Sequence, residues 1–461
     1  MTSPDAAAIR SAVSYLDSWL AFRQQYLRIP GVQAAVYFQD DIVFSGAYGR
    51  ADVEAGTAMT TRHLFRIASH SKTFTATAIL QLAEAGSLRL DDRLGTHLAW
   101  LGENGLGDRT IREVLAHGGG ITRDGVDSGF WTLTLPYPDE AGLRAIAADD
   151  AAILPANERF KYSNIGYSLL GAVIAAVSGE PYNAVVTRAI VDALQLPDTA
   201  PELIWDRLDD YAKGYSGLSY ADKRIPIEHV DTRAMSAATG FTSTAEDVCR
   251  YFAAHFFGDE RLISDASKRL MQRDEWQVED DSWYGLGLSV QKIDDRRMVG
   301  HGGGYPGHST RTLFDPEDRI VVSVLTNAID GAAGELATGA VKLINLAATS
   351  ADEPETAATE RFCGRFANLW SVQDVVRLGG RLHNLSPTQP DPTTNKLELR
   401  VNSEDSLKIA DGPGYGAPGE LMRYDFAGDT VRSIRSGGGM TLHPYEEFRA
   451  AMAGREQITR P

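Results

Sequence analysis

Apolar and polar positions alternate with helical and strand-like periods along the first part of the chain. A helical period predicts an amphipathic helix from about Ala6 to Tyr26. The sequence then predicts a pair of strands, Val32–Phe38 and Ile42–Ala47, joined by a short acidic turn. A second helical pattern opens at Ser69 and ends at Gly86, a residue suited to a helix C-terminus.

The middle of the chain, to about residue 250, is mostly helical in pattern and is interrupted by Gly, Pro and Asp. The helical segments are Ile111–Ala116, Ser168–Ser178, Ala184–Ala193 and Ala245–Phe257. Strand patterns then return, before a last helix, at Leu286–Ile293, Met298–Val299, Thr310–Phe314 and Arg319–Leu325, with the helix at Gly331–Ala347. This order predicts one sheet assembled from both ends of a domain, with a helical lobe over about residues 75–250 and a cleft where the lobes meet.

The last quarter of the chain has a different pattern. Residues 349–359 are polar, acidic and without periodicity, which predicts a linker. Short alternating runs separated by glycine-rich turns follow, at Val375–Arg377, Leu397–Val401, Ser406–Ile409, Met422–Phe426 and Val431–Ile434. We therefore predict a larger domain over residues 1–348 and a small antiparallel β-barrel domain over residues 360–461.

Composition excludes several classes of function. The 461 residues are 43% hydrophobic and 23% charged, as in ordinary globular proteins. A net charge of −17 argues against binding to nucleic acid or to an anionic membrane surface. The two cysteines, Cys249 and Cys363, lie far apart, and the ten histidines include no H-x-x-x-H pair, so we expect no metal site.

The first residues of the sequence carry no basic segment followed by an apolar core, which a secretory signal requires. No apolar run reaches the roughly 18 residues that a membrane span needs. From these two observations we expect a cytoplasmic location.

The start of the second predicted helix carries candidate chemistry. In Ser69-His70-Ser71-Lys72 a hydroxyl and an amine are three residues apart, so they share one face of a helix and can meet. A serine becomes a nucleophile beside a base, and a lysine serves as that base when its pKa is lowered. A helix N-terminus would also favour negative charge developing at Ser69. Alone, the pair is unspecific, because serine and lysine are common.

Two later segments give the pair a context. Tyr162-Ser163-Asn164 comes 90 residues after Lys72, and His301-Gly302-Gly303-Gly304 comes directly before a predicted strand. Taken singly, each has an ordinary interpretation: a half-buried tyrosine, a turn asparagine and a glycine-rich loop. Their order behind Ser69 favours a catalytic interpretation.

In this order the segments resemble the motifs of the penicillin-binding-protein and serine β-lactamase superfamily, which read S-x-x-K, Y-x-N and K-T-G or H-x-G. The resemblance covers about residues 15–345 and is to the branch of D-aminopeptidases, D-Ala-D-Ala carboxypeptidases, class C β-lactamases and β-lactamase-like esterases. The flanking segments that carry it are Leu64–Ser69, Tyr162–Tyr167, Ser243–Asp247 and Phe314–Glu317. It implies an α/β (α+β) fold of the β-lactamase/transpeptidase-like type, with an antiparallel sheet flanked by helices and an all-helical lobe.

The resemblance also implies roles for the reacting side chains. Ser69 is expected to be the nucleophile that forms an acyl-enzyme, while Lys72 and Tyr162 share the general-base role and Tyr162 passes the proton to the leaving group. Tyrosine is a poor base at neutral pH, so we expect the Lys72 cation to lower the pKa of Tyr162. Asn164 is expected to hold Lys72 and a substrate carbonyl.

The glycine-rich motif is expected to complete the site. The resemblance implies an oxyanion hole made by the backbone amides of Ser69 and Gly304, with Gly302 and Gly303 beside the substrate. His301 replaces the lysine of Lys-Thr-Gly, and His-Gly-Gly lacks the hydroxyl and leaves a charge that titrates near neutrality. We therefore expect weak recognition of a free carboxylate, with poor β-lactamase and carboxypeptidase activity.

Two further features concern specificity and an alternative fold. The walls of the cleft are expected around Phe130-Trp131 and Tyr215–Tyr220.

His117-Gly118-Gly119-Gly120 is similar to the oxyanion segment of some α/β-hydrolase esterases, but the chain lacks the G-x-S-x-G elbow of that fold. We expect this segment to be structural.

Three functions remain open from the sequence. The first is a cofactor-free serine hydrolase for small amides or short peptides, similar to D-aminopeptidases and D-amino acid amidases. The second is a β-lactamase-like carboxylesterase, because esters suit the same groups. The third, from another class, is a penicillin-binding-type sensor that is acylated without turnover. The C-terminal domain resembles the lipocalin-like barrels of some relatives, which implies a possible homo-oligomer.

Overall fold

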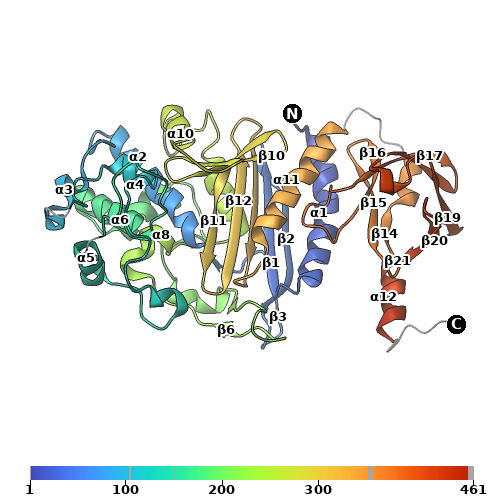
Figure 1. Ribbon diagram of the computed structural model, residues 1–461, viewed down its shortest axis with the longest axis horizontal. Coiled ribbons are helices and arrows are strands. Elements are labelled where there is room, and N and C mark those ends of the chain that lie inside the picture. The colour runs from blue at the N-terminus through green and yellow to red at the C-terminus, as the bar shows by residue number, and fades with distance from the viewer. Residues whose placement is uncertain (1, 103–104, 150, 351–356, 455–461) are drawn as a thin grey trace. The chain divides into compact units, whose positions relative to one another are not determined.

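The computed structural model describes residues 2–102, 105–149, 151–350 and 357–454 (Figure 1). The chain divides into two compact units. Leu27–Ala337 forms one unit, and the residues up to Tyr26 together with those from Thr338 onward form the other. Most of the expected linker, residues 351–356, lies outside the described residues.

A nine-stranded antiparallel sheet is the centre of the unit Leu27–Ala337 (Figure 1). Its strands follow one another in the order β3-β2-β1-β13-β12-β11-β10-β9-β8. β1 pairs with β13, with Val36 opposite Val322, so the prediction that the sheet is assembled from both ends is confirmed. The strands are β1 (Gly31–Phe38), β2 (Asp41–Asp52), β3 (Thr57–Ala58), β8 (Trp276–Glu279), β9 (Ser282–Tyr284), β10 (Ser289–Ile293), β11 (Arg296–Tyr305), β12 (His308–Asp315) and β13 (Ile320–Thr326).

Most of the helices of this unit come between β2 and β10 in the sequence, and they form a helical lobe beside the sheet (Figure 1). Its longest members begin and end as the local sequence dictates: Ser163 caps the first turn of α6, and Gly179, at φ +74°, ends it. The helices are α2 (Ser71–Glu84), α3 (Leu94–His97), α4 (Ile111–Leu115), α5 (Glu140–Ala148), α6 (Asn164–Ser178), α7 (Tyr182–Val186), α8 (Ser236–Thr239), α9 (Ala245–Ala253) and α10 (Asp265–Met271). The predicted helix at 184–193 is α7 followed by a π-helix, Thr187–Asp192.

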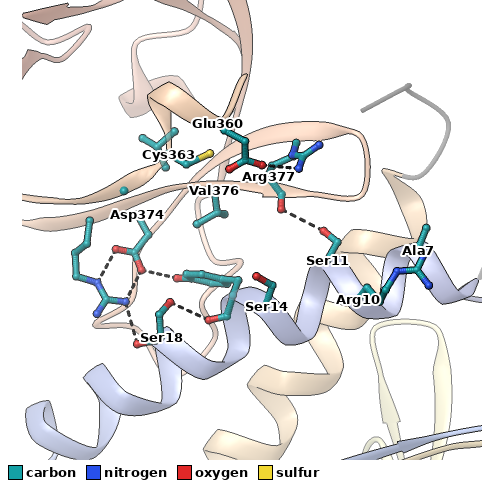
Figure 2. A pocket seen from close by; sticks show the side chains of 14 residues that line it. Ala7, Arg10, Ser11, Ser14, Ser18, Glu360, Cys363, Asp374, Val376 and Arg377 are labelled. Atoms are coloured by element: carbon teal, nitrogen blue, oxygen red, sulfur yellow. Dashed lines mark hydrogen bonds and ion pairs between the residues drawn. The ribbon is translucent and has the colours of Figure 1, made fainter. Parts of the chain in front are cut away.

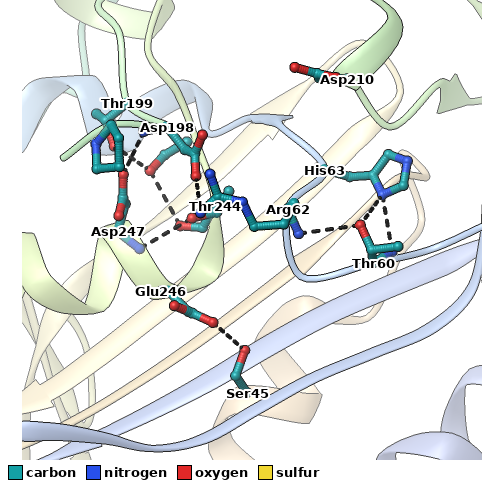
Figure 3. A network of polar contacts seen from close by, with 12 residues as sticks. Ser45, Thr60, Arg62, His63, Asp198, Thr199, Asp210, Thr244, Glu246 and Asp247 are labelled. Atoms are coloured by element: carbon teal, nitrogen blue, oxygen red, sulfur yellow. Dashed lines mark hydrogen bonds and ion pairs between the residues drawn. The ribbon is translucent and has the colours of Figure 1, made fainter.

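A polar network fixes the segment that leads to Ser69 (Figure 3). Arg62 forms an ion pair with Asp198 at 2.7 Å, and Asp247 accepts a hydrogen bond from the backbone N–H of Asp198 at 2.9 Å. On the sheet side, the Ser45 hydroxyl of β2 donates to Glu246 of α9 at 2.7 Å. The short strands β4 (Phe65–Arg66) and β7 (Thr242–Ser243) pair directly beyond this network. The residues that precede Ser69 are therefore fixed by the ion pair of Arg62 and by the pairing of β4 with β7.

The other unit contains a closed antiparallel barrel, which confirms the predicted β-barrel domain. The barrel consists of β14 (Gly364–Ala367), β15 (Val372–Leu378), β16 (Arg381–Leu385), β17 (Leu397–Ser403), β18 (Ser406–Asp411), β19 (Leu421–Ala427), β20 (Thr430–Arg435) and β21 (Thr441–Pro444). The predicted N-terminal helix, α1 (Ala6–Tyr26), belongs to this unit, as does most of α11 (Ala333–Thr349).

Helix α1 is attached to the barrel by specific polar contacts (Figure 2). The Tyr15 hydroxyl donates to Asp374 at 2.7 Å, and Arg365 pairs with the same carboxylate at 2.7 Å. The Ser11 hydroxyl donates to the carbonyl of Arg377 at 3.2 Å. These contacts border a pocket of about 570 Å³.

Within the described ranges, no single helix is both long and apolar enough to cross a membrane; the bent pair Asn164–Ser178 and Tyr182–Asp192 meets that test by length and composition alone.

Candidate active site

Ser69 lies in a tight turn directly before α2. The turn is the 3₁₀ helix η1 (Ala68–His70), so the predicted start of an α-helix at Ser69 is wrong by two residues. Ala68 has φ +50°, a conformation that costs a residue with a Cβ about 1 kcal/mol. The Ser71 hydroxyl compensates by donating to the Ala68 carbonyl at 2.6 Å and accepting from Phe241 N–H at 3.0 Å. Ser69 itself is half-buried and faces a cleft.

Lys72 is fully buried and is held by three oxygen atoms. Its Nζ lies 2.7 Å from Asn164 Oδ1, 2.8 Å from the Ala238 carbonyl and 3.3 Å from Ser69 Oγ. Burial lowers the pKa of Lys72 well below its usual value, and the negative charge of Asp124 opposes this shift only in part. A neutral amine has two N–H groups and one lone pair. Its N–H groups can donate to Asn164 and to the Ala238 carbonyl, so the lone pair can face Ser69.

Asn164, the first residue of α6, connects this lysine to a carboxylate. Its Oδ1 accepts from Lys72, and its Nδ2 donates to Asp124 Oδ1 at 2.7 Å. The other oxygen of Asp124 accepts from Arg123 at 3.2 Å. The contacts of Asn164 with Lys72 and Asp124 fix the orientation of its side-chain amide. The second N–H of this amide is then available to a substrate carbonyl. Asn164 and Asp124 both line the cleft.

Tyr162 lies over the lysine and the Arg123 side chain. Lys72 Nζ is 4.8 Å from the centre of the Tyr162 ring, and the Arg123 guanidinium is 5.2 Å from it. Burial raises the pKa of Tyr162, and hydrogen bonding with Ser69 and the charge of Arg123 reduce the rise. The expectation that Lys72 lowers the pKa of Tyr162 below its ordinary value is therefore wrong. Burial keeps the phenol protonated and favours the neutral form of the lysine.

His117 fixes the backbone around Tyr162. Its Nδ1 accepts a hydrogen bond from Ser163 N–H at 3.1 Å, and its carbonyl accepts from Lys161 N–H at 2.8 Å. Its ring centre lies 4.3 Å from that of Tyr162. The segment that begins with His117 thus supports the Tyr162 motif through packing and backbone contacts.

The glycine-rich motif lies inside strand β11 rather than before a strand. β11 pairs with β12 from Val299 to Tyr305. Gly303 faces the Ser69 turn so closely that an added Cβ would lie 2.3 Å from the Ile67 carbonyl oxygen. A Cβ at Gly304 would meet no atom within 4 Å. The glycines therefore let β11 approach the serine while Gly304 faces open space.

His301 is buried and uncharged in this environment. Its Nδ1 is 2.6 Å from the Gly302 carbonyl, which requires a proton on Nδ1, and its Nε2 accepts from the Tyr284 hydroxyl at 3.1 Å. Burial, with the nearby His70 and Lys72, lowers the pKa of His301 well below the usual histidine value. The expectation of a charge that titrates near neutrality at this position is wrong.

The cleft that contains Ser69 has a volume of about 680 Å³. It brings together Ser69, Tyr162, Asn164, His301, Gly302 and Gly304. Trp131 lines it as expected, beside Phe160 and Trp283. The second expected wall lies elsewhere: Tyr215 pairs with Pro226 of a short strand, and its hydroxyl donates to Glu54 at 2.8 Å.

Sequence reasoning missed several polar residues of this cleft, among them Asp124, Tyr284 and Arg311. None belongs to a motif, and Tyr284 lies on β9, a strand that the sequence did not predict. Arg311 had one usable signal, because a charged residue interrupts the apolar run that predicted β12. Among the described residues, no group of three or more His, Cys, Asp or Glu is placed to hold a metal ion.

An antiparallel sheet joined to a helical lobe, with a serine three residues before a buried lysine, defines the β-lactamase and penicillin-binding-protein class of serine-hydrolase-like proteins. The chain belongs to the Beta-lactamase family, whose model matches residues 17–345.

A penicillin-binding protein of Bacillus subtilis (strain 168) is 27% identical over 308 residues, covering 62% of this chain and 66% of that protein. The chain therefore spans about two thirds of the length of this relative.

Two solved structures share the fold. The octameric penicillin-binding protein homologue from Pyrococcus abyssi has a TM-score of 0.65 and 22% identity, covering 93% of this chain and 99% of that chain. The D-amino acid amidase from Ochrobactrum anthropi SV3, complexed with D-phenylalanine, has a TM-score of 0.63 and 21% identity, covering 73% of this chain and 99% of that chain.

Proposed function

We propose that this chain is a serine hydrolase that cleaves amides of amino acids or short peptides through an acyl-enzyme, in the manner of a D-aminopeptidase or D-amino acid amidase. The observation that carries the proposal is the buried Lys72, with its lowered pKa, 3.3 Å from Ser69 Oγ. The likeness in fold to a D-amino acid amidase supports the substrate class. The chemistry requires no cofactor.

In the acylation step, Ser69 Oγ attacks the carbonyl carbon and its proton moves to the neutral amine of Lys72. The positions of Asn164 and the Ala238 carbonyl support this role, because they engage the two N–H groups and direct the lone pair toward the serine. The backbone amides of Ser69 and Gly304 stabilise the oxyanion of the tetrahedral intermediate.

In the next step the C–N bond breaks and the leaving amine takes a proton from the Tyr162 hydroxyl, which recovers one from Lys72. The raised pKa of Tyr162 supports an acid role, because the phenol is protonated at rest. Water then attacks the acyl-enzyme, Lys72 accepts its proton, and Lys72 returns that proton to Ser69 Oγ as the bond between Oγ and the acyl carbon breaks. We therefore propose that Lys72 alone is the base and that Tyr162 is the acid, whereas the sequence suggested that the two share the base role and that Tyr162 passes the proton to the leaving group.

Asp124 supports substrates with a free amino group. Its carboxylate is mostly buried at the cleft and has neutral Asn164 and exposed Arg123 as partners. We propose that Asp124 binds the ammonium group of the substrate. The scissile carbonyl carbon is bonded to the α-carbon that carries this ammonium group, so it lies next to Ser69 in the bound substrate. His301 has a positioning role, since both of its ring nitrogens are engaged within the protein.

The test is a panel of D- and L-amino acid amides with the purified 461-residue chain. We expect hydrolysis of D-amides, loss of at least about 10³-fold in Ser69→Ala, and full activity in Ser87→Ala, which removes an exposed hydroxyl near the end of α2. Full activity in Ser69→Ala would contradict the proposal.

The same panel separates the alternatives. Faster turnover of p-nitrophenyl esters than of the matching p-nitroanilides, with no amide cleaved, would indicate an esterase. Acylation by a fluorophosphonate with no multiple turnover of any substrate would indicate a sensor.

We also propose that the chain self-associates through its barrel. Leu369 and Trp370, in the turn between β14 and β15, are 58% and 85% exposed, and large apolar side chains side by side favour an interface. The octameric homologue of similar fold supports the idea. Light scattering should give a mass that is a multiple of 50.1 kDa and that falls in Trp370→Ser.

A further inference from the structure

The helical lobe contains a second pocket, of about 510 Å³, that is separate from the cleft at Ser69. Within the described ranges, no residue lines both. Helices α3, α5, α6 and α8 of the lobe (Figure 1) contribute to its walls, together with α7. Pockets that hold small organic ligands usually measure about 300–1,000 Å³, so this pocket has the size of a ligand site.

Apolar side chains predominate in this pocket. Leu98 and Leu143 are buried in its wall, and Ala172 of α6 presents only a methyl group to it. The rings of Trp100 and Tyr182 add flat apolar surfaces. The pocket therefore suits an aromatic or aliphatic group.

One charge in the pocket has no ion-pair partner among the described residues. Arg144 pairs with Glu140 at 2.5 Å, and the His97 ring contacts Asp92 at 3.1 Å. Arg233 is exposed and forms no ion pair with any described residue. The pocket thus combines an apolar surface with an available guanidinium, a group that binds carboxylates through two parallel N–H groups.

Two walls of this pocket also hold Lys72 in place. The Lys72 amine contacts Asn164, at the start of α6, and the carbonyl of Ala238 in α8. Ser168 lines the pocket from α6, and its hydroxyl donates to the Asn164 carbonyl at 3.0 Å. Ala237 lines the pocket from α8 and directly precedes Ala238. A ligand in the pocket therefore contacts the two helices that orient the lysine.

A pair of hydrogen bonds gives a second connection to α2. The Tyr182 hydroxyl of the pocket wall lies 2.7 Å from Thr75 Oγ1, which donates to the Ala237 carbonyl at 2.7 Å. Thr75 is fully buried on α2, three residues after Lys72. Contact of a ligand with Tyr182 therefore acts on both α2 and α8.

We propose that this pocket binds a small amphipathic carboxylate, with its apolar group against the aliphatic and aromatic side chains and its carboxylate on Arg233, and that the bound ligand activates Ser69. Binding stabilises the arrangement of α6 and α8 that holds the Lys72 amine, because a ligand favours the form that it binds. The activation rests on the proposed function only for the role of Lys72 as the base of Ser69.

The binding test uses 4-phenylbutanoate and its uncharged analogue 4-phenylbutanamide with Ser69→Ala protein, which lacks the nucleophile. Calorimetry should show the acid binding about tenfold or more tighter than the amide, as for a hydrogen bond to a charged group. The preference should disappear in Ser69→Ala/Arg233→Gln. It should persist in Ser69→Ala/Arg269→Gln, which removes an exposed charge from α10.

A second variant tests the apolar part of the pocket. Ala172→Leu, combined with Ser69→Ala, fills the pocket from α6 and should weaken the binding of both probes. Thermal melting checks that each variant is folded. Equal binding of acid and amide, or binding of the acid that neither Arg233→Gln nor Ala172→Leu changes, overturns the site.

Activation is measured as the rate at which a fluorophosphonate labels Ser69 in the wild-type protein. In this reaction the bond between Ser69 Oγ and phosphorus forms, fluoride leaves, and Lys72 accepts the hydroxyl proton. Saturating 4-phenylbutanoate should raise the rate about fivefold or more, the lower end of typical coupling between sites. The same concentration should leave the rate in Arg233→Gln unchanged.

The labelling rate separates this inference from the proposed function. If 4-phenylbutanoate accelerates labelling but the protein cleaves no amide, the proposed function fails and the second site stands. If amides are cleaved but saturating 4-phenylbutanoate leaves labelling unchanged or slows it, the activation is overturned and the proposed function stands.

Discussion

A methyl group added at Gly303 would lie 2.3 Å from the Ile67 carbonyl oxygen, so strand β11 and the Ser69 turn meet where there is no room for a side chain. The same methyl group would lie 2.4 Å from the Thr310 hydroxyl oxygen. Because both neighbours are fixed by the sheet and by the turn, substitution here must move β11 away from the serine.

Gly303→Ala should therefore reduce kcat/KM by about 100-fold, the effect of misplacing reacting groups by about 1 Å. It should also lower the free energy of unfolding by about 1–3 kcal/mol through overpacking. Gly334→Ala is the control: its Cβ meets no atom within 4 Å in α11. Activity assays and thermal melting check both variants, and wild-type kinetics in Gly303→Ala would refute the close-contact argument.

Lys72 should give the pH–rate profile its acid limb. The base must be neutral, and burial lowers its pKa, so kcat/KM should fall as pH decreases through a value well below the ordinary lysine pKa of about 10.4. Lys72→Arg keeps a cation that does not deprotonate, and it should lose about 10³-fold or more at every pH. An arginine variant with substantial activity would mean that another group is the base.

His301 should not titrate in the working range. Its pKa is lowered well below the usual value, so the neutral ring persists as pH falls from 8 toward the usual histidine pKa of about 6.5. Because Asn can donate to the Gly302 carbonyl, His301→Asn should change kcat/KM without changing the shape of the profile near pH 6.5. A limb near that pH that vanishes in the variant would show a titrating His301.

Asp124→Asn should remove the preference for substrates with a free amino group. The substitution keeps the shape of the side chain and its contact with Asn164 but loses the charge. We expect kcat/KM for D-alanine amide to fall about 10–100-fold, and the value for N-acetyl-D-alanine amide to change much less. Equal losses on both substrates would assign Asp124 to the support of Asn164 instead.

The buried ion pair of Arg66 and Glu202 should support the Ser69 segment. Arg66 is fully buried on β4, and its guanidinium lies 2.6 Å from Glu202. Glu202→Gln leaves that charge uncompensated and should destabilise the protein by about 3–5 kcal/mol in denaturant unfolding. Glu246→Gln, at the exposed Ser45 contact, is expected to cost far less.

Much of the fold follows from periodicity. The runs Val32–Phe38 and Arg319–Leu325 predict the two central strands within a residue or two, because most of their residues are apolar. The predicted helix from Ala6 to Tyr26 matches α1. The polar strands β8 and β9 were not predicted, since their sequences carry little hydrophobic pattern.

The candidate site likewise has residues that the sequence predicts and properties that it does not predict. Ser69, Lys72 and Asn164 were found because they belong to the S-x-x-K and Y-x-N motifs, and in the structure Lys72 contacts both of the other two. The ionisation of Tyr162 and His301 could not be predicted, because it depends on burial that only the packed structure defines. Asp124 and Arg311 contribute single side chains from unrelated segments, and the charge of Arg311 within a predicted strand is the one sequence signal for either of them.

The pairing of β1 with β13 has a consequence for synthesis on the ribosome. Gly31–Phe38 leaves the exit tunnel early, yet its partner Ile320–Thr326 is translated almost 300 residues later. At about 5–20 residues per second, an apolar strand edge waits tens of seconds for its neighbour. The nascent chain therefore depends on chaperones or on the partial shelter of β2 during that interval, and truncated products that end before β13 should be prone to aggregation.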